Sequence, residues 1–435
     1  MSDTDRNKLD PPPEIPEIDP MEHDLLLTGA AIAELGASAE LLVGGKNYNT
    51  ALISQIKGIK APQFRAIASG AFHLLLDESR VLSRPIKDLV NREYEKIKWR
   101  GSEVNTDPDF LKHFVRRLGH SLAQRKPSSS GGKPVSLREF INQVVAGFAD
   151  SEEGIDRLRK RSVLVQTAIL SVELPERVKA TVAEAYRSIC REAGLETVPV
   201  AVRSSAAGED SQKKAFAGLQ DTYLNITTEE DCIQAYHWNC ASAYNLRSMT
   251  YRREAIRDAL EQAKLAGDEQ LAEAAIQEWG VENTSLSVCI MRMIDPVISG
   301  TAFSADTATG CRGTSQNDLV SIDSSYGLGE AVVSGLVTPD KCYVFQKEDG
   351  QEVVIRQMGA KDKEIVYDQE KGGTRIITVP EEKRYRWSLS LTQAEEVAKG
   401  VRAISRTYQG LIMDTEFCID QWGDLWFVQA RPETR

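Results

Sequence analysis

Disulfide and zinc chemistry are the first functions that the sequence argues against, because it lacks the cysteine and histidine patterns that they need. Its seven cysteines are scattered and odd in number, and no two of them form a CxxC pair. Its five histidines form no cluster with the spacing of metal ligands. Structural thiols in a reducing compartment are the expected role of the cysteines. The sequence therefore predicts a cytoplasmic protein.

Positive charge and long apolar runs are also scarce. The chain has 53 Lys and Arg residues against 64 Asp and Glu residues, which gives a net charge of −11. A nucleic-acid partner would need a basic stripe, and no apolar run is long enough to span a bilayer. Neither nucleic acid nor a membrane is therefore an expected partner. With 435 residues, 41% of them hydrophobic, the chain can bury a large core.

The order of helical and strand-like segments predicts an α+β enzyme rather than a bundle or a sandwich. Residues 1–24 are acidic and proline-rich without an apolar signal-peptide core, which predicts a disordered tail. Residues 25–229 are expected to form the N-terminal part of the folded region, with a charged helical insertion over 84–148. Residues 230–435 are expected to form its C-terminal part.

Four local patterns predict particular elements. The stretch "ELLVGGKN" is expected to form a short strand, a glycine turn and a helix that starts near Asn47. An amphipathic helix should end at Gly194, a residue typical of C-caps. Residues 253–279 have the composition of a solvent-facing helical hairpin. A last helix should be opened by a cap at Thr392.

The C-terminal sequence "MDTEFCIDQWGDLWFVQARPETR" predicts a β-hairpin around the turn "QWGD". A symmetric hairpin pairs Glu416 with Gln429 and Asp414 with Arg431. Because side chains alternate between the faces of a strand, these four residues should share one face. The opposite, core-facing side is expected to carry Phe417, Ile419, Trp426 and Val428.

Hard oxygen donors on one face of a hairpin suit Mg²⁺, which is usually held by one or two carboxylates and by substrate phosphates. Arg431 would be able to bind a phosphate through two N–H groups. An exposed polar face with a cross-strand Asp–Arg pair is the simpler alternative. The hairpin alone leaves both interpretations open.

Three other segments have residues typical of phosphate binding. In "VGGKN", Lys46 follows two glycines at a helix start, although the Walker spacing GxxxxGK[ST] is absent. In "AVRSSAAGEDSQKKAFAGLQ", Arg203 leaves a strand into small polar residues, and Gly218 follows in a second loop. In "SSYGLGEAVVSGLVTPD", three glycines surround Glu330. An ordinary turn or a surface arginine would explain each segment taken alone, but together they have the groups that nucleotide–Mg²⁺ chemistry needs.

These segments, together with "SGTAFSADTATG" and the C-terminal hairpin, resemble the N-terminal nucleotide-binding domain of the phosphoenolpyruvate synthase (pyruvate, water dikinase) family. Pyruvate phosphate dikinase and rifampicin phosphotransferase share that domain. The resemblance runs in order from about Leu41 to Thr434. It implies an ATP-grasp fold of several α+β subdomains that clamps ATP. It also implies that a phosphoryl group of ATP passes to a histidine on a separate domain, and from there to pyruvate or to an antibiotic.

The resemblance also implies roles for single residues. Lys46, Arg203, Arg247 and Arg431 would bind and neutralise the phosphates of ATP. Gly218 would belong to a loop that covers them. The strand with Met291 and Met293 would meet the adenine through its backbone. The expected metal ligands are Glu416 and Gln429, holding Mg²⁺, with Asp414 beside them.

The sequence departs from the family pattern in ways that leave alternatives open. Glutamine is frequent in the family where Met291 and Leu219 stand here, and the segments 84–148 and 253–280 look expanded. A "TCHAA"-like histidine motif is absent from the 435 residues. A phosphohistidine domain, and pyruvate through it, would then act in trans or lie in a longer chain. The alternatives are an ATP-grasp phosphotransferase or ligase for an antibiotic or natural product, and a non-catalytic nucleotide-sensing module.

Overall fold

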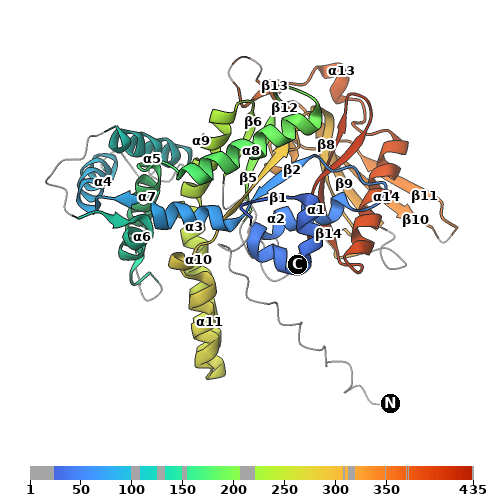
Figure 1. The fold of residues 1–435 in the computed structure, drawn as a ribbon. Helices are drawn as coiled ribbons and strands as arrows, with labels where there is room; N and C mark the ends of the chain where they lie inside the picture. Colours follow the sequence, from blue (N-terminus) through green and yellow to red (C-terminus); the bar gives the residue numbers. More distant parts are fainter. Residues whose placement is uncertain are drawn as a thin grey trace.

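Two β-sheets organise the chain in the computed structural model (Figure 1), which describes residues 24–98, 108–124, 133–148, 154–205, 221–306, 309–311, 319–347, 349–368, 370 and 372–433. The tail predicted for residues 1–24 lies outside these residues, apart from Asp24. The subdomain boundaries proposed from the sequence stay a prediction.

In the described part of the chain, the smaller sheet has five antiparallel strands in the order β1-β2-β7-β5-β6. Their bounds are Leu26–Thr28 for β1, Phe64–Ile67 for β2, Ser287–Arg292 for β7, Val200–Ser205 for β5 and Thr222–Ile226 for β6. Strand β7 is buried on both faces, as its run of apolar residues dictates. Val288 and Ile290 pack into the main helical core, and Cys289 and Met291 pack toward helices α1 (Gly29–Leu35) and α2 (Ala39–Ser54).

Helices cover the other face of this sheet and extend from it (Figure 1). They are α3 (Ser69–Glu78), α4 (Ser83–Lys98), α5 (Pro108–Ala123), α6 (Leu137–Val145), α7 (Ile155–Leu170), α8 (Glu176–Ala193) and α9 (Glu229–Ser242), with the short strands β3 (Arg80–Val81) and β4 (Val135–Ser136). The described parts of segment 84–148 are thus largely helical, as predicted, and they bury Tyr94, Phe114 and Phe140 in the main core. Helix α8 ends as predicted at Gly194, which takes the left-handed conformation at φ 68°.

The predicted helical hairpin is present as α10 (Leu246–Ala266) and α11 (Glu269–Trp279), which are joined by Gly267 and Asp268. It projects from the body of the molecule as an arm (Figure 1). The arm is buried at its root, where Met249 and Ile256 are 0% and 1% exposed. Its tip is open to solvent, and Leu265 there is 83% exposed.

Residues 296–432 form the larger sheet, whose described strands run antiparallel in the order β11-β10-β9-β8-β14-β15. These strands are β8 (Pro296–Phe303), β9 (Leu319–Tyr326), β10 (Asp340–Gln346), β11 (Glu352–Gln357), β14 (Met413–Asp420) and β15 (Leu425–Pro432). Helix α14 (Leu391–Thr407) packs on one face and forms a second apolar core with it. Helices α12 (Glu330–Val333) and α13 (Glu381–Arg384) and the hairpin of β12 (Lys363–Tyr367) and β13 (Thr374–Thr378) complete this half.

The strand predicted ahead of the glycines of "VGGKN" is wrong. Leu42 and Val43 are helical and bury their side chains among α1 and the smaller sheet instead of pairing with a strand. The glycine break itself is real, because Gly44 has φ 73° and ψ 165° inside α2. A Cβ atom on Gly44 would lie 2.3 Å from the carbonyl oxygen of Ser205, so only glycine lets α2 approach the end of β5.

The cap of α14 was also predicted wrongly. Ser390, not Thr392, is the N-cap, and its hydroxyl accepts a hydrogen bond from the backbone N–H of Gln393. The Gln393 side chain accepts in return from the backbone N–H of Ser390 at 2.9 Å, which completes a capping box. The N-cap therefore lies two residues earlier than the sequence pattern indicated.

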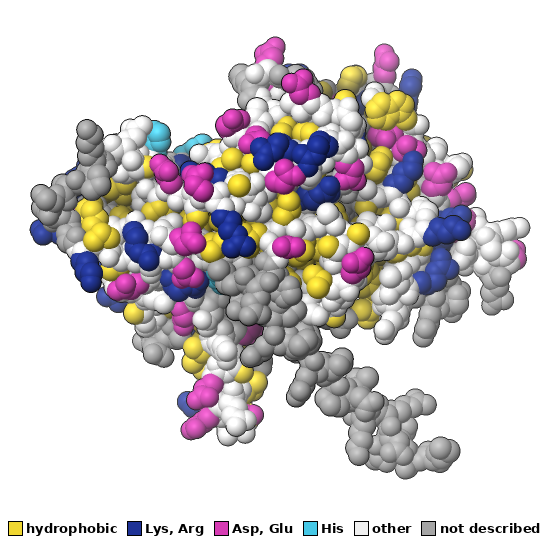
Figure 2. All heavy atoms as spheres, viewed as in Figure 1, with side chains coloured by type: hydrophobic (Ala, Val, Ile, Leu, Met, Phe, Trp, Pro, Cys, Tyr) yellow, Lys and Arg dark blue, Asp and Glu magenta, His cyan; other side chains and the backbone are white. Residues whose placement is uncertain are grey.

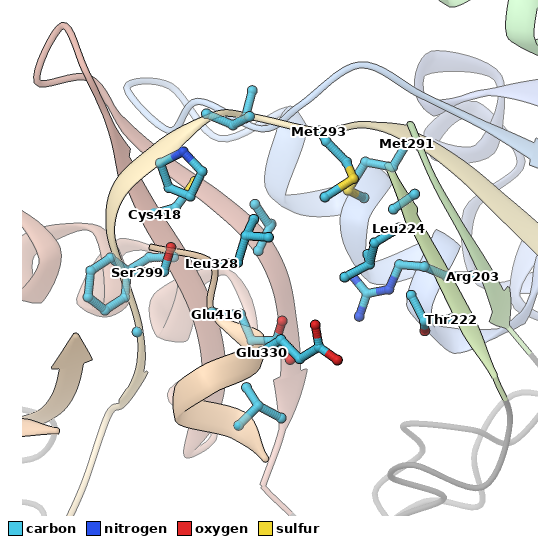
Figure 3. A pocket seen from close by; sticks show the side chains of 18 of the residues that line it. Arg203, Thr222, Leu224, Met291, Met293, Ser299, Leu328, Glu330, Glu416 and Cys418 are labelled. Atoms are coloured by element: carbon cyan, nitrogen blue, oxygen red, sulfur yellow. The ribbon is translucent and has the colours of Figure 1, made fainter. Parts of the chain in front are cut away.

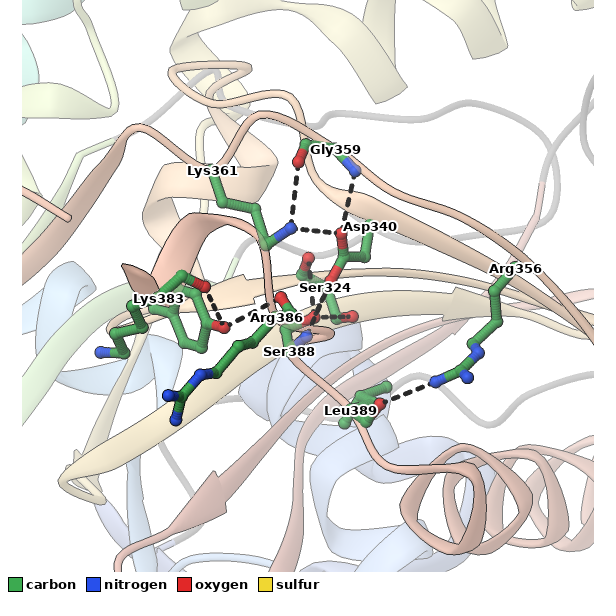
Figure 4. A network of polar contacts seen from close by, with 10 residues as sticks. Ser324, Asp340, Arg356, Gly359, Lys361, Lys383, Arg386, Ser388 and Leu389 are labelled. Carbon is green, nitrogen blue, oxygen red and sulfur yellow. Dashed lines mark hydrogen bonds and ion pairs between the residues drawn. The ribbon is translucent and has the colours of Figure 1, made fainter. Parts of the chain in front are cut away.

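A buried polar network joins three segments of the larger half (Figure 4). Lys361 Nζ lies 2.5 Å from Asp340 Oδ1, and the two side chains are 0% and 1% exposed. The same carboxylate accepts hydrogen bonds from the backbone N–H groups of Gly359 and Ser388, at 2.9 and 2.7 Å. The network thereby ties the loop before β12 and the segment before α14 to the start of β10.

Candidate functional site

A cavity of about 260 Å³ lies between the two sheets (Figure 3). The smaller sheet supplies one wall through β5, β6 and β7, and the larger sheet supplies the other through β8, β14 and β15. Residues of the turn before α12 and of α12 itself line it as well. The lining side chains labelled in Figure 3 are Arg203, Thr222, Leu224, Met291, Met293, Ser299, Leu328, Glu330, Glu416 and Cys418.

The side chains divide the cavity into an apolar part and a charged part. Met291, Met293 and Leu328 provide apolar surface next to Ile294. In Figure 3 the carboxylates of Glu416 and Glu330 point toward the guanidinium of Arg203, with Thr222 beside it. A ligand that fits both parts combines an apolar group with a charged group.

Arg203 connects the two walls. It lies on β5 between Cys289 of β7 and Thr222 of β6, and its Nη2 donates a hydrogen bond to Oε1 of Gln429 on the opposite sheet. Lys46 lies near the same end of β5, where its Nζ donates to the backbone oxygen of Ser204 at 3.5 Å. Burial raises the pKa of the Cys289 thiol to about 12, and the positive charges of Arg203 and Lys46 oppose that rise. Both cations therefore act on one small region of the smaller sheet.

The hairpin pairs predicted at the C-terminus are present. Glu416 is opposite Gln429, and Asp414 is opposite Arg431. Arg431 Nε donates to Asp414 Oδ2 at 2.9 Å, so the cross-strand Asp–Arg pair that the sequence left open also exists. Burial raises the pKa of Asp414 to about 6; Arg431 opposes the rise, while Glu416 and Glu433 add to it. The charged face of the hairpin thus lies at the cavity and is partly neutralised within itself.

The core-facing side of the hairpin was predicted only in part. Phe417 and Ile419 are buried as expected, but the register shifts between Glu416 and Phe417. Phe417 is consequently opposite Phe427, which is 1% exposed and belongs to the core. Val428 instead lines the cavity, and Trp426 donates its Nε1–H to Asp420 at 2.9 Å. The extra residue of a β-bulge turned these two side chains away from the core.

Comparison with known families identifies the kind of domain that contains this cavity. Residues 40–435 match the family described as "Pyruvate phosphate dikinase, AMP/ATP-binding domain". The chain belongs to this family. The expected α+β, ATP-grasp fold is confirmed, and ATP is the ligand of the domain.

Curated relatives of this ATP-binding domain are called phosphoenolpyruvate synthase. The chain is 31% identical over 354 residues to that of Synechocystis sp., which covers 70% of this chain and 40% of that protein. It is 28% identical over 407 residues to that of Pyrococcus furiosus, which covers 92% of this chain and 43% of that protein. The chain therefore spans less than half the length of these relatives.

Among solved structures, D-alanyl-alanine synthetase A from Vibrio cholerae O1 aligns with 63% of this chain and 62% of its own, at 7% identity. The TM-score of that alignment is 0.20, which is too low to carry an argument.

Not every residue predicted for the ATP site lines the cavity. Arg203, Met291, Met293 and Glu416 line it. Gln429 accepts a hydrogen bond from Arg203, which lines the cavity. Asp414 and Arg431 pair with each other on the same hairpin, and Lys46 donates to the backbone oxygen of Ser204. Arg247 is exposed in the first turn of α10 and is absent from the described lining. Gly218 lies outside the described residues.

Sequence reasoning missed several lining residues. Glu330 was noticed in "GLGE" but received no role, although its carboxylate faces Arg203 in Figure 3. Burial raises the pKa of this carboxyl. Thr222, Leu224 and Ser299 have side chains with no chemical signature, so only the pairing of their strands would have placed them at the cavity.

Metal binding at the hairpin rests on a small donor set. In the described part of the chain, no group of three or more His, Cys, Asp and Glu residues is arranged to hold a metal ion. Glu416 and Gln429 offer one carboxylate and one amide oxygen, and Gln429 is only 6% exposed. Mg²⁺ commonly takes so few protein ligands when substrate phosphates supply the rest. The residues present therefore fit Mg²⁺ only as part of a complex with a phosphorylated ligand.

Membrane insertion finds no support in the helices. Over the residues that the structure describes, every helix is too short or too polar to cross a bilayer. On the face shown in Figure 2, acidic and basic side chains of the described residues are interspersed.

Proposed function

We propose that this domain binds MgATP between its two sheets and carries out the phosphoryl-donor half-reaction of a phosphoenolpyruvate synthase type of enzyme. The observation that carries the proposal is the pair of opposed walls. Arg203 stands on one wall and Glu416 with Gln429 stands on the other, and a hydrogen bond joins Arg203 to Gln429. The apolar part around Met291 and Met293 suits the adenine ring, and the charged part suits the triphosphate.

Positioning and electrostatics would do most of the catalytic work, as is general in phosphoryl transfer. Arg203 and Lys46 approach the triphosphate from the smaller sheet, and Arg431 approaches it from the hairpin. Their charges offset the negative charge that moves between phosphate oxygens. Glu416 and Gln429 would hold Mg²⁺, which would supply further positive charge near the phosphates. Asp414 holds the Arg431 guanidinium on the hairpin, because its Oδ2 lies 2.9 Å from Nε and 2.8 Å from Nη2.

The phosphoryl group would pass to a histidine on another domain and from there to pyruvate. The names of the relatives support this destination, and so does the fact that the match covers only 40% and 43% of their length. We infer that such a domain is a partner of this one, and that the reaction takes place in the cytoplasm. A role for Arg247 at the phosphates stays a prediction.

Thermal unfolding with and without MgATP tests the binding step. MgATP at about 100 times its Kd should stabilise the domain by about 2.7 kcal/mol, because it binds only the folded chain. The double variant Glu416→Ala, Gln429→Ala should still unfold at a defined temperature, but MgATP should raise that temperature very little. Lys363→Ala, an exposed change outside the cavity, serves as the control and should keep the full shift. A wild-type protein that MgATP does not stabilise would overturn the proposal.

Phosphohistidine formation tests the transfer step. The domain is mixed with MgATP and a separately expressed histidine domain of a phosphoenolpyruvate synthase, and the products are analysed by intact mass spectrometry. A phosphorylated histidine domain is the expected result. ATP binding without transfer to a cognate domain would instead support a nucleotide-sensing module.

A further inference from the structure

The strand β6 of the ATP cavity has weak support from its own sheet. Within the described part of the chain it lies at the edge of the five-stranded sheet and pairs only with β5. That pairing is irregular, because the register shifts between Val200 and Val202. Thr222 and Leu224 nevertheless line the cavity, and Thr222 is the direct neighbour of Arg203. Something outside the ladder has to hold this strand.

The opposite face of β6 is held by the charged helix α5. Tyr223 points to this face because side chains alternate along a strand. Its hydroxyl accepts a hydrogen bond from Arg116 Nη2 at 2.9 Å and donates to Asp221 Oδ2 at 2.8 Å. Lys112 Nζ lies 3.1 Å from the same carboxylate oxygen of Asp221. Two residues of α5, one turn apart, therefore grip Asp221 and Tyr223, the residues on either side of Thr222 where β6 begins.

Stacking strengthens this contact. The Arg116 guanidinium lies 3.8 Å from the centroid of the Trp238 ring on α9 and 5.3 Å from that of Tyr223. The rings of Tyr223 and Trp238 are themselves 5.3 Å apart. Lys112 Nζ completes the cluster at 4.7 Å from the Tyr223 ring. A planar guanidinium that packs against two neighbouring aromatic rings is a geometry that lysine does not reproduce.

We propose that Arg116 is a positioning residue for ATP binding, which acts through Tyr223 to hold Thr222, Leu224 and the adjoining Arg203 against the nucleotide. This role rests on the proposed ATP function and gives the segment 84–148 a task in it. The effect should be confined to β6, because Arg116 and Lys112 contact the smaller sheet at that strand. Arg116 also borders a second cavity of about 460 Å³ between α5 and α9, so truncating it enlarges a space that already exists.

The test compares Arg116→Ala with Arg117→Ala, which removes the same charge from the next, exposed position of α5. Isothermal titration with MgATP should give a Kd about tenfold higher for Arg116→Ala, since the cation–π contacts with two rings and one hydrogen bond are lost. Arg117→Ala should bind as the wild type does. Tyr223→Phe, which keeps the ring and loses only the hydroxyl, should weaken binding by a smaller factor of about three.

Hydrogen exchange without nucleotide separates positioning from general loss of stability. In Arg116→Ala, amide exchange should rise in β6 and remain unchanged in β7 at the centre of the sheet. A rise of equal size in both strands would overturn the positioning role. So would an unchanged Kd for Arg116→Ala, or an equal loss in Arg117→Ala.

Failure of the proposed function would look different from failure of this inference. If the wild-type domain does not bind MgATP, the proposed function fails, and the exchange experiment still tells whether Arg116 holds β6. If Arg116→Ala does not fold, Tyr223→Phe carries the same test with the milder change.

Discussion

Two charged side chains, Lys361 and Asp340, lie in the interior of the larger half and meet there. Removing water from two charges is costly, and the cost is offset only when both find partners. Here Asp340 receives Lys361 and the backbone N–H groups of Gly359 and Ser388, and Lys361 also donates to the Gly359 carbonyl at 3.0 Å. Loss of either member would therefore leave the other charge buried without its partner. The intact pair holds the neighbouring segments in place.

Lys361→Met should lower the free energy of unfolding by about 3–5 kcal/mol, because it leaves the Asp340 charge buried without its cation. The double variant Asp340→Asn, Lys361→Met should be more stable than Lys361→Met alone, since no charge is left unpaired. Urea unfolding measures both. Lys363→Met, two residues away and exposed, should change stability by no more than about 0.5 kcal/mol. A Lys361→Met variant as stable as this control would show that the pair contributes nothing.

Several polar residues at the cavity were predictable as single side chains. Arg203, Glu416 and Gln429 follow from hairpin symmetry and from the order of motifs, and the structure brings these three together. Arg247 is not among the residues that line the described cavity; it lies in the first turn of α10, and its role at the phosphates stays a prediction. The apolar and hydroxyl residues of the lining were not predictable, since nothing in a threonine or a leucine distinguishes a cavity wall from any other strand face.

Among the helices and strands, α2 shows how a single backbone position decides the geometry of a site residue. Gly44 lets α2 bend where it meets β5, and Lys46 follows two residues later in the same helix. The backbone N–H of Asn47 then donates to Ser205 Oγ at 3.2 Å. The break in the helix and its contact with β5 together place the Lys46 ammonium by Ser204.

Gly44→Ala should destabilise the domain by about 1–3 kcal/mol more than Gly58→Ala does. Both glycines have positive φ, at 73° and 88°, so both variants incur the strain of about 1–2 kcal/mol that a side chain meets in that region. Only at Gly44 would the new Cβ also collide with Ser205, since no atom lies within 4 Å of a Cβ at Gly58. Chemical unfolding of the two variants measures the difference. Equal losses would mean that α2 moves away from β5 without cost.

Local sequence patterns predicted most helices and strands. They failed where a segment could form either of two structures and tertiary contacts decided between them. The strand β7 and the helix α8 follow from runs and periodicity. Residues 41–43 are apolar and short, which suits a strand or a buried helix equally, and packing against the smaller sheet favoured the helix. The bulge at Val428 has no sequence signal of its own, so the symmetric hairpin was right from Asp414 to Glu416 and wrong beyond them.

The chain as a whole separates an ATP-binding body from a projecting arm. The two sheets and their helices enclose the cavity, whereas α10 and α11 leave the body and pack mainly on each other (Figure 1). The root of the arm belongs to the body, because Trp279 is 8% exposed and meets the Tyr251 ring at 6.1 Å. The tip does not, since Leu265 and Leu271 are 83% and 42% exposed.

Replacing residues 261–273 by a short glycine–serine turn should therefore leave the domain folded and still able to bind MgATP. The removed part adds almost no surface to either apolar core of the body, and it lies beyond Arg247 and the residues at the root. Thermal unfolding should show an unchanged MgATP-induced shift. Trp279→Ala at the root should instead lower stability by about 3–5 kcal/mol, because it opens a cavity in the main core. A shortened protein that folds but no longer responds to MgATP would mean that the arm takes part in closing the ATP site, and the body would then not be sufficient for binding.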